Sequence, residues 1–135
     1  MRHAICYLSN SNLNFTKEEV EELLITTQKK YEDRKIKGLF LYSERNVFQI
    51  IEGEKEEVFK LWEEKKNDKR HKNIIKIFEE ELTTSPFDSY LCEYISDDDK
   101  FNSDKVNKLH NHLKSLEDKP RNAAEEILKL FLKSR

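Results

Sequence analysis

Two side chains in this sequence combine a polar group with an apolar setting, and they are the first candidates for chemistry. Tyr7 lies in the run Ile5-Cys6-Tyr7-Leu8, and Gln49 lies in Phe48-Gln49-Ile50-Ile51. A buried phenol or amide needs hydrogen-bond partners, so each of these residues either points outward or joins a polar network.

No residue pattern predicts an enzyme or a metal site. The pair His110-x-His112 is the closest approach to metal-ligand spacing, but residues two apart on a helix do not share a face. Asp97-Asp98-Asp99 could bind a cation, although an acidic loop of this kind is usually only solvated. No nucleophile lies in a recognised motif, and two glycines cannot form a glycine-rich phosphate loop.

Composition excludes several classes of protein. Of the 135 residues 39% are charged, and 25 basic against 27 acidic side chains leave a net charge of -2 with the signs interspersed. This balance indicates no nucleic-acid partner. No apolar stretch approaches a membrane span, and no signal pattern begins the chain, so we expect a cytoplasmic protein. Cys6 and Cys92 have no CxxC spacing and are expected to be buried thiols.

The apolar periodicity predicts an α+β fold. Thr16 and Glu19 have the spacing of a capping box, which marks the start of a helix. The predicted strands are 3–9, 36–42, 47–52, 73–81 and 87–95, and the predicted helices are 17–30, 54–66, 104–116 and 123–133. The order β-α-β-β-α-β-β is that of a ferredoxin-like sheet with two helices on one face, followed by two C-terminal helices.

Strand alternation predicts which side chains face the core. Phe48 and Ile50 fall on one face, whereas Gln49 and Ile51 fall on the other, so Gln49 is expected to point inward beside an apolar neighbour.

The same alternation places Ile75 and Ile77 of the fourth strand on one face, and Ile74 and Phe78 on the other. The C-terminal helices have apolar stripes, through Leu109 for example, that need burial on the free face of the sheet or on a partner.

Several short segments together resemble a known family. They are Ile5-Cys6-Tyr7-Leu8-Ser9, Ile36 to Tyr42, Phe48-Gln49-Ile50-Ile51-Glu52-Gly53, and Asp68-Lys69-Arg70-His71 with Asn73-Ile74. In this order and spacing, residues 3–95 resemble the BLUF family of blue-light sensors that use FAD. The resemblance implies residues 1–96 as a BLUF-like domain and 97–135 as a C-terminal helical extension. It also implies a noncovalent flavin between the first two helices, with its ring edge facing the sheet.

The resemblance implies two photoactive residues. Tyr7 matches the tyrosine that gives an electron and a proton to the excited flavin, and Gln49 matches the glutamine that bridges this tyrosine to the flavin. Light is then expected to rearrange the Tyr7–Gln49–flavin hydrogen bonds and to shift the absorption slightly to the red. Tyr90 and Cys92 stand where many members have a tryptophan and a methionine.

Further flavin-binding positions are implied on the first helix and after the second. Thr27 and Lys30 match sites beside the cofactor, and Arg70 and His71 match a basic pair near the ribityl and phosphate groups. Tyr31 stands where the family has an asparagine that hydrogen-bonds the flavin carbonyl and imide. A tyrosine has one hydroxyl and cannot offer the paired donor and acceptor of an amide.

Three functions remain open on the sequence. The first is a photoreceptor that uses FAD or the related FMN and signals to a separate downstream protein. The alternative is a degenerate BLUF-like module without flavin, acting in protein–protein interaction or as a homo-oligomer, and Tyr31 favours it. The third is an RNA-binding fold, since Lys37-Gly38-Leu39-Phe40-Leu41 is faintly similar to an RNP1 motif. The net charge of -2 argues against RNA.

Overall fold

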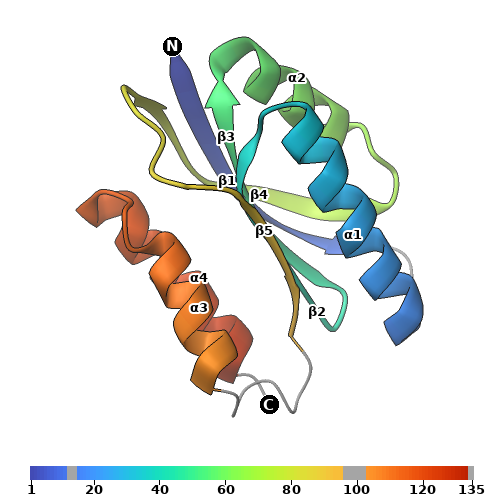
Figure 1. The fold of residues 1–135 in the computed structure, drawn as a ribbon. Coiled ribbons are helices and arrows are strands. Elements are labelled where there is room, and N and C mark those ends of the chain that lie inside the picture. The colour runs from blue at the N-terminus through green and yellow to red at the C-terminus, as the bar shows by residue number, and fades with distance from the viewer. Residues whose placement is uncertain (12–14, 96–102, 134–135) are drawn as a thin grey trace.

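The computed structural model describes residues 1–11, 15–95 and 103–133, and it has the expected ferredoxin-like α+β fold (Figure 1). The elements are β1 (Arg2–Ser11), α1 (Lys17–Asp33), β2 (Lys37–Ser43), β3 (Asn46–Glu54), α2 (Lys55–Lys66), β4 (His71–Leu82), β5 (Tyr90–Tyr94), α3 (Ser103–Leu113) and α4 (Asp118–Lys133). The sheet order is β4-β1-β3-β2-β5. β5 runs parallel to β2, and the other neighbours are antiparallel.

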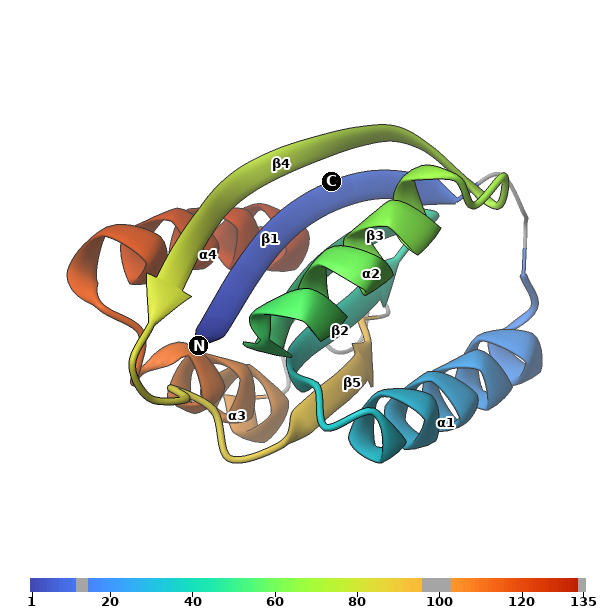
Figure 2. The same ribbon diagram turned by 90° about the horizontal axis from the view of Figure 1, so that it is seen from above.

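The sheet is covered on both faces. Helices α1 and α2 pack on one face, and α3 and α4 pack on the other, as Figures 1 and 2 both show. The apolar stripes of the C-terminal helices are therefore buried on the face of the sheet that α1 and α2 leave free. Among the described helices, none is long and apolar enough to cross a membrane.

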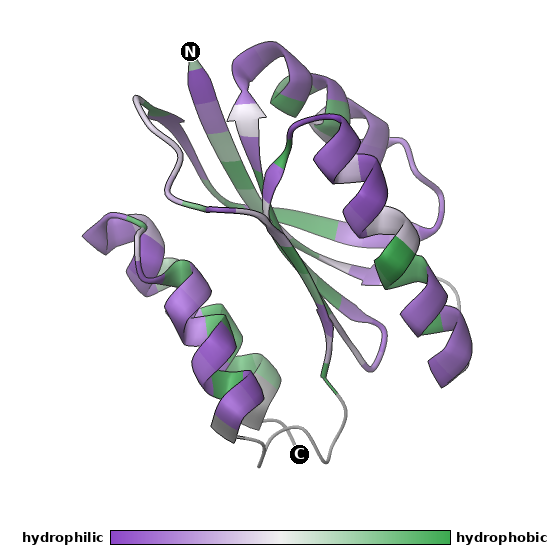
Figure 3. Cartoon of the chain, viewed as in Figure 1, coloured by the Kyte–Doolittle hydropathy of each residue, from purple (hydrophilic) through white to green (hydrophobic). Residues whose placement is uncertain are grey.

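Two apolar cores result, one on each side of the sheet. Tyr7, Phe40 and Ile51 belong to the core beneath α1 and α2. Phe48 and Leu128 belong to the core beneath α3 and α4. Figure 3 shows hydrophobic residues along the central strands, whereas most residues of α1 and α2 are hydrophilic. Burial on both faces explains why the central strands have near-continuous apolar runs.

Local sequence signals account for the ends of several elements. The capping box is present, because the backbone amide of Glu19 donates to Thr16 Oγ1 at 3.2 Å and that of Thr16 donates to Glu19 Oε1 at 2.9 Å. The β2–β3 hairpin turns at Glu44 and Arg45, whose φ angles are 48° and 71°. Two consecutive positive φ angles are typical of a type I′ turn, here formed without glycine.

The structure corrects four boundaries by three residues or more, and one of them is the end of α3, which lies at Leu113 and not at residue 116. Helix α1 continues beyond Lys30 to Asp33, so Tyr31 lies in its last turn. Strand β5 begins at Tyr90, because the segment from Phe87 to Ser89 lies outside the ladder. Helix α4 begins at Asp118, and Pro120 fits within its first turn, where no intrahelical amide bond is lost. The proposed domain boundary at 96/97 and Asp97-Asp98-Asp99 lie outside the described residues.

Strand β4 contains a bulge that changes the predicted faces. Cys6 of β1 pairs with Phe78, but the next residue, Tyr7, pairs with Lys76, so Ile77 is an extra residue in β4. An extra residue breaks the two-residue alternation of a strand. Phe78 consequently packs on the core beneath α3 and α4, together with Ile77, and not on the side of Ile74 as predicted.

Candidate functional site

A buried hydrogen-bonded chain joins three strands beneath α1. The Tyr7 hydroxyl on β1 donates to Oε1 of Gln49 on β3, and Nε2 of Gln49 donates to the Tyr90 hydroxyl at 2.6 Å. Tyr7 and Gln49 are 0% exposed, and Tyr90 is 1% exposed. Gln49 therefore points into the core, as the strand alternation predicted, and both ends of its amide have partners within the protein.

The sheet register explains this meeting of side chains. Tyr7 and Gln49 are direct cross-strand partners in the β1–β3 ladder. Tyr90 reaches Gln49 from β5, which is two strands away from β3. The β2 residue paired with Tyr90 is Gly38, where a Cβ would collide with the Ile50 carbonyl oxygen and where φ is 138°. Tyr90 is a partner of Gln49 that the sequence did not predict.

Tyr7 and Tyr90, the two tyrosines hydrogen-bonded to Gln49, are neutral phenols at ordinary pH. Burial raises the pKa of Tyr7 and the pKa of Tyr90 well above the usual value for tyrosine. A neutral phenol both donates and accepts hydrogen bonds. Each hydroxyl can therefore either donate to the Gln49 oxygen or accept from the Gln49 nitrogen.

Tyr31 lies against this chain from the side of α1. Its ring packs edge-to-face on Tyr90, with the centroids 4.7 Å apart and the planes at 82°. The side chain is 1% exposed, yet the hydroxyl has no hydrogen-bond partner among the described residues. Burial raises the pKa of Tyr31 to about 12. The Gln49 side chain is near enough to oppose this rise, although no hydrogen bond of ordinary geometry joins the two.

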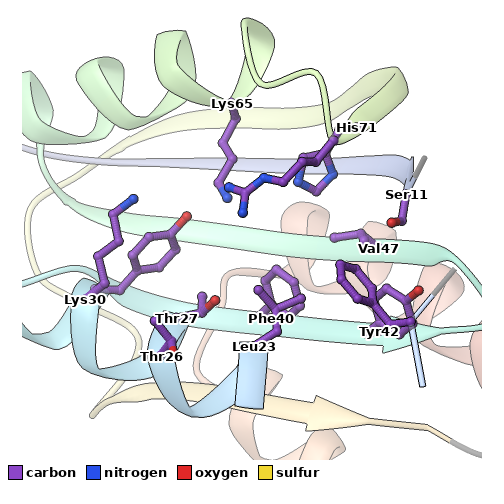
Figure 4. A pocket seen from close by; sticks show the side chains of 13 residues that line it. Ser11, Leu23, Thr26, Thr27, Lys30, Phe40, Tyr42, Val47, Lys65 and His71 are labelled. Atoms are coloured by element: carbon purple, nitrogen blue, oxygen red, sulfur yellow. The ribbon is translucent and has the colours of Figure 1, made fainter. Parts of the chain in front are cut away.

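A pocket of about 160 Å³ opens between α1 and the end of α2 (Figure 4). Its lining residues are Ser11, Phe15, Leu23, Thr26, Thr27, Lys30, Tyr31, Phe40, Tyr42, Val47, Lys65, Arg70 and His71. The pocket thus brings together five of the predicted flavin-binding residues, namely Thr27, Lys30, Tyr31, Arg70 and His71. Tyr7 and Gln49 do not line the pocket, and Tyr31 stands between it and Tyr90.

The basic side of the pocket is held by local contacts. Asp68 accepts hydrogen bonds from Nη2 of Arg70 at 2.8 Å and from Nε at 3.0 Å. This guanidinium holds the pKa of the Asp68 carboxyl well below its usual range. Nδ1 of His71 lies 3.1 Å from Oγ of Ser9. Burial, assisted by the positive charge of Lys65, lowers the pKa of His71 to about 4.

Lys65 is a pocket residue that the sequence analysis missed. It follows Leu61 by one helical turn, so it continues the buried stripe of α2, and this spacing was a usable signal. Its ammonium lies 5.7 Å from the centroid of the Tyr31 ring, a cation–π contact. Burial lowers the pKa of Lys65.

The sequence of this chain is similar to that of a known protein family. The profile of the family described as BLUF, sensors of blue-light using FAD, matches residues 3–93. The chain belongs to the BLUF family. A comparison with curated protein sequences finds no match.

Several solved structures share the fold of this domain. The photo-activated state of BlsA is 21% identical with a TM-score of 0.63, and the alignment covers 100% of this chain and 97% of BlsA. A bacterial light-regulated adenylyl cyclase is 22% identical with a TM-score of 0.65, over 98% of this chain and 40% of the cyclase. Klebsiella pneumoniae BlrP1 with FMN and cyclic diGMP is 16% identical with a TM-score of 0.74, over 98% of this chain and 34% of BlrP1. The chain therefore spans about two-fifths or less of these last two proteins.

The pocket of this BLUF domain fits a flavin in three respects. Phe40, Tyr42 and Val47 provide an apolar surface for a ring system. The basic side chains suit the phosphate groups of a nucleotide. The Tyr31 hydroxyl is a buried donor that lacks a partner in the described protein. Gln49 does not line this BLUF pocket, whereas Tyr31, whose ring packs on Tyr90, does. Among the described residues, no group of histidine, cysteine and acidic side chains could hold a metal ion.

Proposed function

We propose that this chain is a blue-light photoreceptor domain that holds FAD noncovalently in the pocket between α1 and α2. The observation that carries the proposal is the buried chain Tyr7–Gln49–Tyr90, which lies next to that pocket. Membership of a family of sensors that use FAD supports the choice of ligand. A bound flavin supplies blue-light absorption and an excited state that accepts an electron.

Tyr7, Gln49 and Tyr90 can form two different hydrogen-bonding arrangements. In the observed one, Tyr7 donates to the Gln49 oxygen and the Gln49 nitrogen donates to Tyr90. A half-turn of the amide would exchange its oxygen and nitrogen, after which Tyr90 donates and Tyr7 accepts. Because a hydroxyl can play both roles, no buried polar group loses its partner in either state. Gln49 is thus proposed as a two-position switch, with Tyr7 as the photoactive donor.

Thr27, Lys30, Arg70 and His71 are proposed to hold the ligand, because all four line the pocket. A flavin that contacts Gln49 needs the Tyr31 ring to turn away from its present position. We propose that Tyr31 moves for this purpose when the ligand enters.

The response is proposed to leave the domain through β5. Tyr90 begins this strand, and its neighbours contact α3: Lys105 Nζ donates to the Tyr94 carbonyl at 2.7 Å, and Lys108 Nζ donates to Glu93 Oε1 at 2.9 Å. A change at Tyr90 can therefore alter how α3 packs. The recipient is proposed to be a separate protein, in a non-membrane, cytoplasmic setting.

An absorption experiment tests this function. The protein is incubated with FAD, freed of unbound ligand by gel filtration, and measured before and after blue light. We expect a structured flavin band with a small, reversible red shift. Gln49→Leu should retain the band and lose the shift. Gln28→Leu, which changes the other glutamine of the chain, should keep both. An unchanged shift in Gln49→Leu would remove Gln49 from the mechanism.

A flavin-free interaction module is the second candidate function. It is favoured by two observations: the protein itself satisfies both ends of the Gln49 amide, and Gln49 does not line the pocket. This candidate predicts that the natural chain retains no flavin. Replacing Tyr31 by Asn opens the inner end of the pocket and should strengthen flavin retention in either case. Equal or weaker retention in Tyr31→Asn would show that Tyr31 is not the obstacle.

A further inference from the structure

Strand β4 forms an edge of the sheet, and its outer side has no strand partner among the described residues. It is the longest of the described strands, with 12 residues from His71 to Leu82, and none of the twelve is buried. Figure 2 shows β4 as the outermost strand, beyond β1. The free backbone donors and acceptors of such an edge can pair with a strand of another chain.

The charges of β4 are divided between its two halves. The first half contains two lysines, Lys72 and Lys76, and the second contains three consecutive glutamates, Glu79, Glu80 and Glu81. Lys76 is paired with Glu79 at 2.6 Å, and Glu81 with a lysine of α2 at 3.5 Å. Within the described part of the chain, neither Lys72 nor Glu80 forms an ion pair. One cation and one anion, near opposite ends of the strand, are therefore available to a partner.

The side chains of Lys72 and Glu80 lie on the same face of the sheet. Their partners in β1 are Asn10 and Ala4, which are six residues apart. Residues an even number apart in a regular strand share a face, and directly paired residues point to the same side. Cys6 lies on that face of β1 and belongs to the core beneath α3 and α4. Both charged side chains therefore lie on the side of the C-terminal helices.

An exposed apolar patch lies between these two charges. Ile75 pairs with Leu8, which also packs on the core beneath α3 and α4. The side chain of Ile75 is 58% exposed, and that of Leu130 in α4 is 63% exposed. Both line a groove of about 300 Å³ together with Leu8 and Phe131. Exposed apolar side chains that gather in one place indicate an interaction surface.

We propose that β4 pairs with β4 of a second copy of this chain, antiparallel and about a two-fold axis at Lys76. Pairing centred there sets Lys72 of each copy opposite Glu80 of the other, so that two ion pairs form. It also sets Ile75 of each copy opposite Ile77 of the other. A two-fold interface must be self-complementary, because every contact occurs twice. Opposite charges directly across an antiparallel pair stabilise it.

The features of β4 that discourage other partners leave this one available. Charged side chains and bulges protect an edge strand against nonspecific pairing. Strand β4 has both, with one bulge at Ile77. At the axis the two Lys76 side chains approach each other, but each ammonium is bound by Glu79 of its own chain. Dimerisation through β4 requires no flavin and is independent of the proposed function.

Exchange of charges tests the pairing in the full chain. The mass in solution is measured by analytical ultracentrifugation over a range of concentrations at low ionic strength. We expect it to approach that of two 135-residue chains as the concentration rises. Lys72→Glu and Glu80→Lys should each weaken the dimer at least about tenfold, because like charges then face each other twice. Lys29→Glu changes an exposed lysine of α1 and should leave the dimer unchanged.

A mixture of the two variants gives the decisive readout. Equimolar Lys72→Glu and Glu80→Lys should dimerise with about the natural affinity, because opposite charges meet again at both contacts. Recovery in the mixture, when neither variant dimerises alone, supports the β4 pairing and shows that both variants fold. A mixture that stays monomeric overturns it, and so does a dimer that neither substitution weakens. A natural chain that is monomeric at every concentration also overturns it and leaves the edge to a different protein.

Discussion

Gln49 has an unusual position for an amide, because two tyrosines from different strands bind its oxygen and its nitrogen. Tyr7 donates to one end and Tyr90 accepts from the other, all three side chains being buried. Since both phenols can exchange roles, the amide has two orientations of similar hydrogen-bonding quality. A switch of this kind depends on Tyr90 as much as on Tyr7, which makes Tyr90 the residue to change first.

Replacing Tyr90 by Phe should destabilise the protein by about 1–3 kcal/mol, because the Gln49 amide nitrogen then lies buried without an acceptor. The free energy of unfolding, measured by urea denaturation, checks this. Tyr94→Phe is the control: it removes a hydroxyl of the same strand with no hydrogen-bond partner among the described residues, and should change the stability by no more than about 0.5 kcal/mol. Equal effects of the two substitutions would contradict the proposed hydrogen bond.

The lowered pKa of His71 predicts that the folded protein loses stability in mild acid. Its folded-state pKa is about 4, against 6.5 for an ordinary histidine, so the unfolded chain takes up a proton at higher pH than the folded protein. The stability should therefore be unaffected by His71 above pH 6.5 and should fall as the pH drops from 6.5 toward 4. The urea midpoint as a function of pH measures this. His71→Gln should flatten the slope in that window, and an identical slope would refute the prediction.

Much of the residue-level account could be read from the sequence, and the reasons for the omissions are physical. Alternation within one strand predicted that Gln49 points inward. The partnership with Tyr90 depends on β5 lying beside β2, a long-range pairing that local periodicity does not encode. Lys65 was missed because a lysine in a charged helix is usually solvated, and only its spacing from Leu61 placed it on the buried side.

At the scale of elements, α3 and α4 are part of the domain core. Leu109 and Leu113 of α3 and Leu128 of α4 are fully buried against strand residues such as Phe48. His112 also contacts the sheet, with Nε2 at 2.5 Å from the Gly38 carbonyl oxygen. The C-terminal helices thus contact the same strands that carry the Tyr7–Gln49–Tyr90 chain, on the opposite face.

A matched pair of leucines in α4 tests this packing. Leu128 is 0% exposed and Leu130 is 63% exposed on the same helix. Leu128→Ala should lower the free energy of unfolding by about 2–5 kcal/mol, because it leaves a cavity beneath the sheet. Leu130→Ala should change it by no more than about 0.5 kcal/mol. Urea denaturation gives both values, and similar losses in the two variants would show that α4 does not dock as described.

The elements also show where sequence periodicity fails. The helices and strands were predicted in the correct order, since their apolar spacing and the Thr16 cap are local signals. The bulge at Ile77 was not predicted, because it depends on the pairing of β4 with β1 and leaves no mark in the composition of β4. One extra residue was enough to move Phe78 to the other face.

For the whole molecule, the sheet separates the layer that contains the proposed ligand pocket from the layer formed by the C-terminal helices. The pocket lies on the α1 and α2 side, and the C-terminal helices lie on the other (Figure 2). The strands between them carry residues of both cores, so a rearrangement at Gln49 lies one sheet thickness from α3 and α4. We therefore expect light to change the orientation of the Gln49 amide.

The most direct test is a light-minus-dark infrared difference spectrum of the FAD-loaded protein with glutamine labelled by ¹³C at the side-chain carbonyl. The chain has two glutamines, so Gln28→Glu leaves Gln49 as the single labelled site. We expect illumination to shift the labelled carbonyl band, because the oxygen exchanges one tyrosine for the other, and we expect the shift to reverse in the dark. A flavin that responds to light while the labelled band stays unchanged would contradict it.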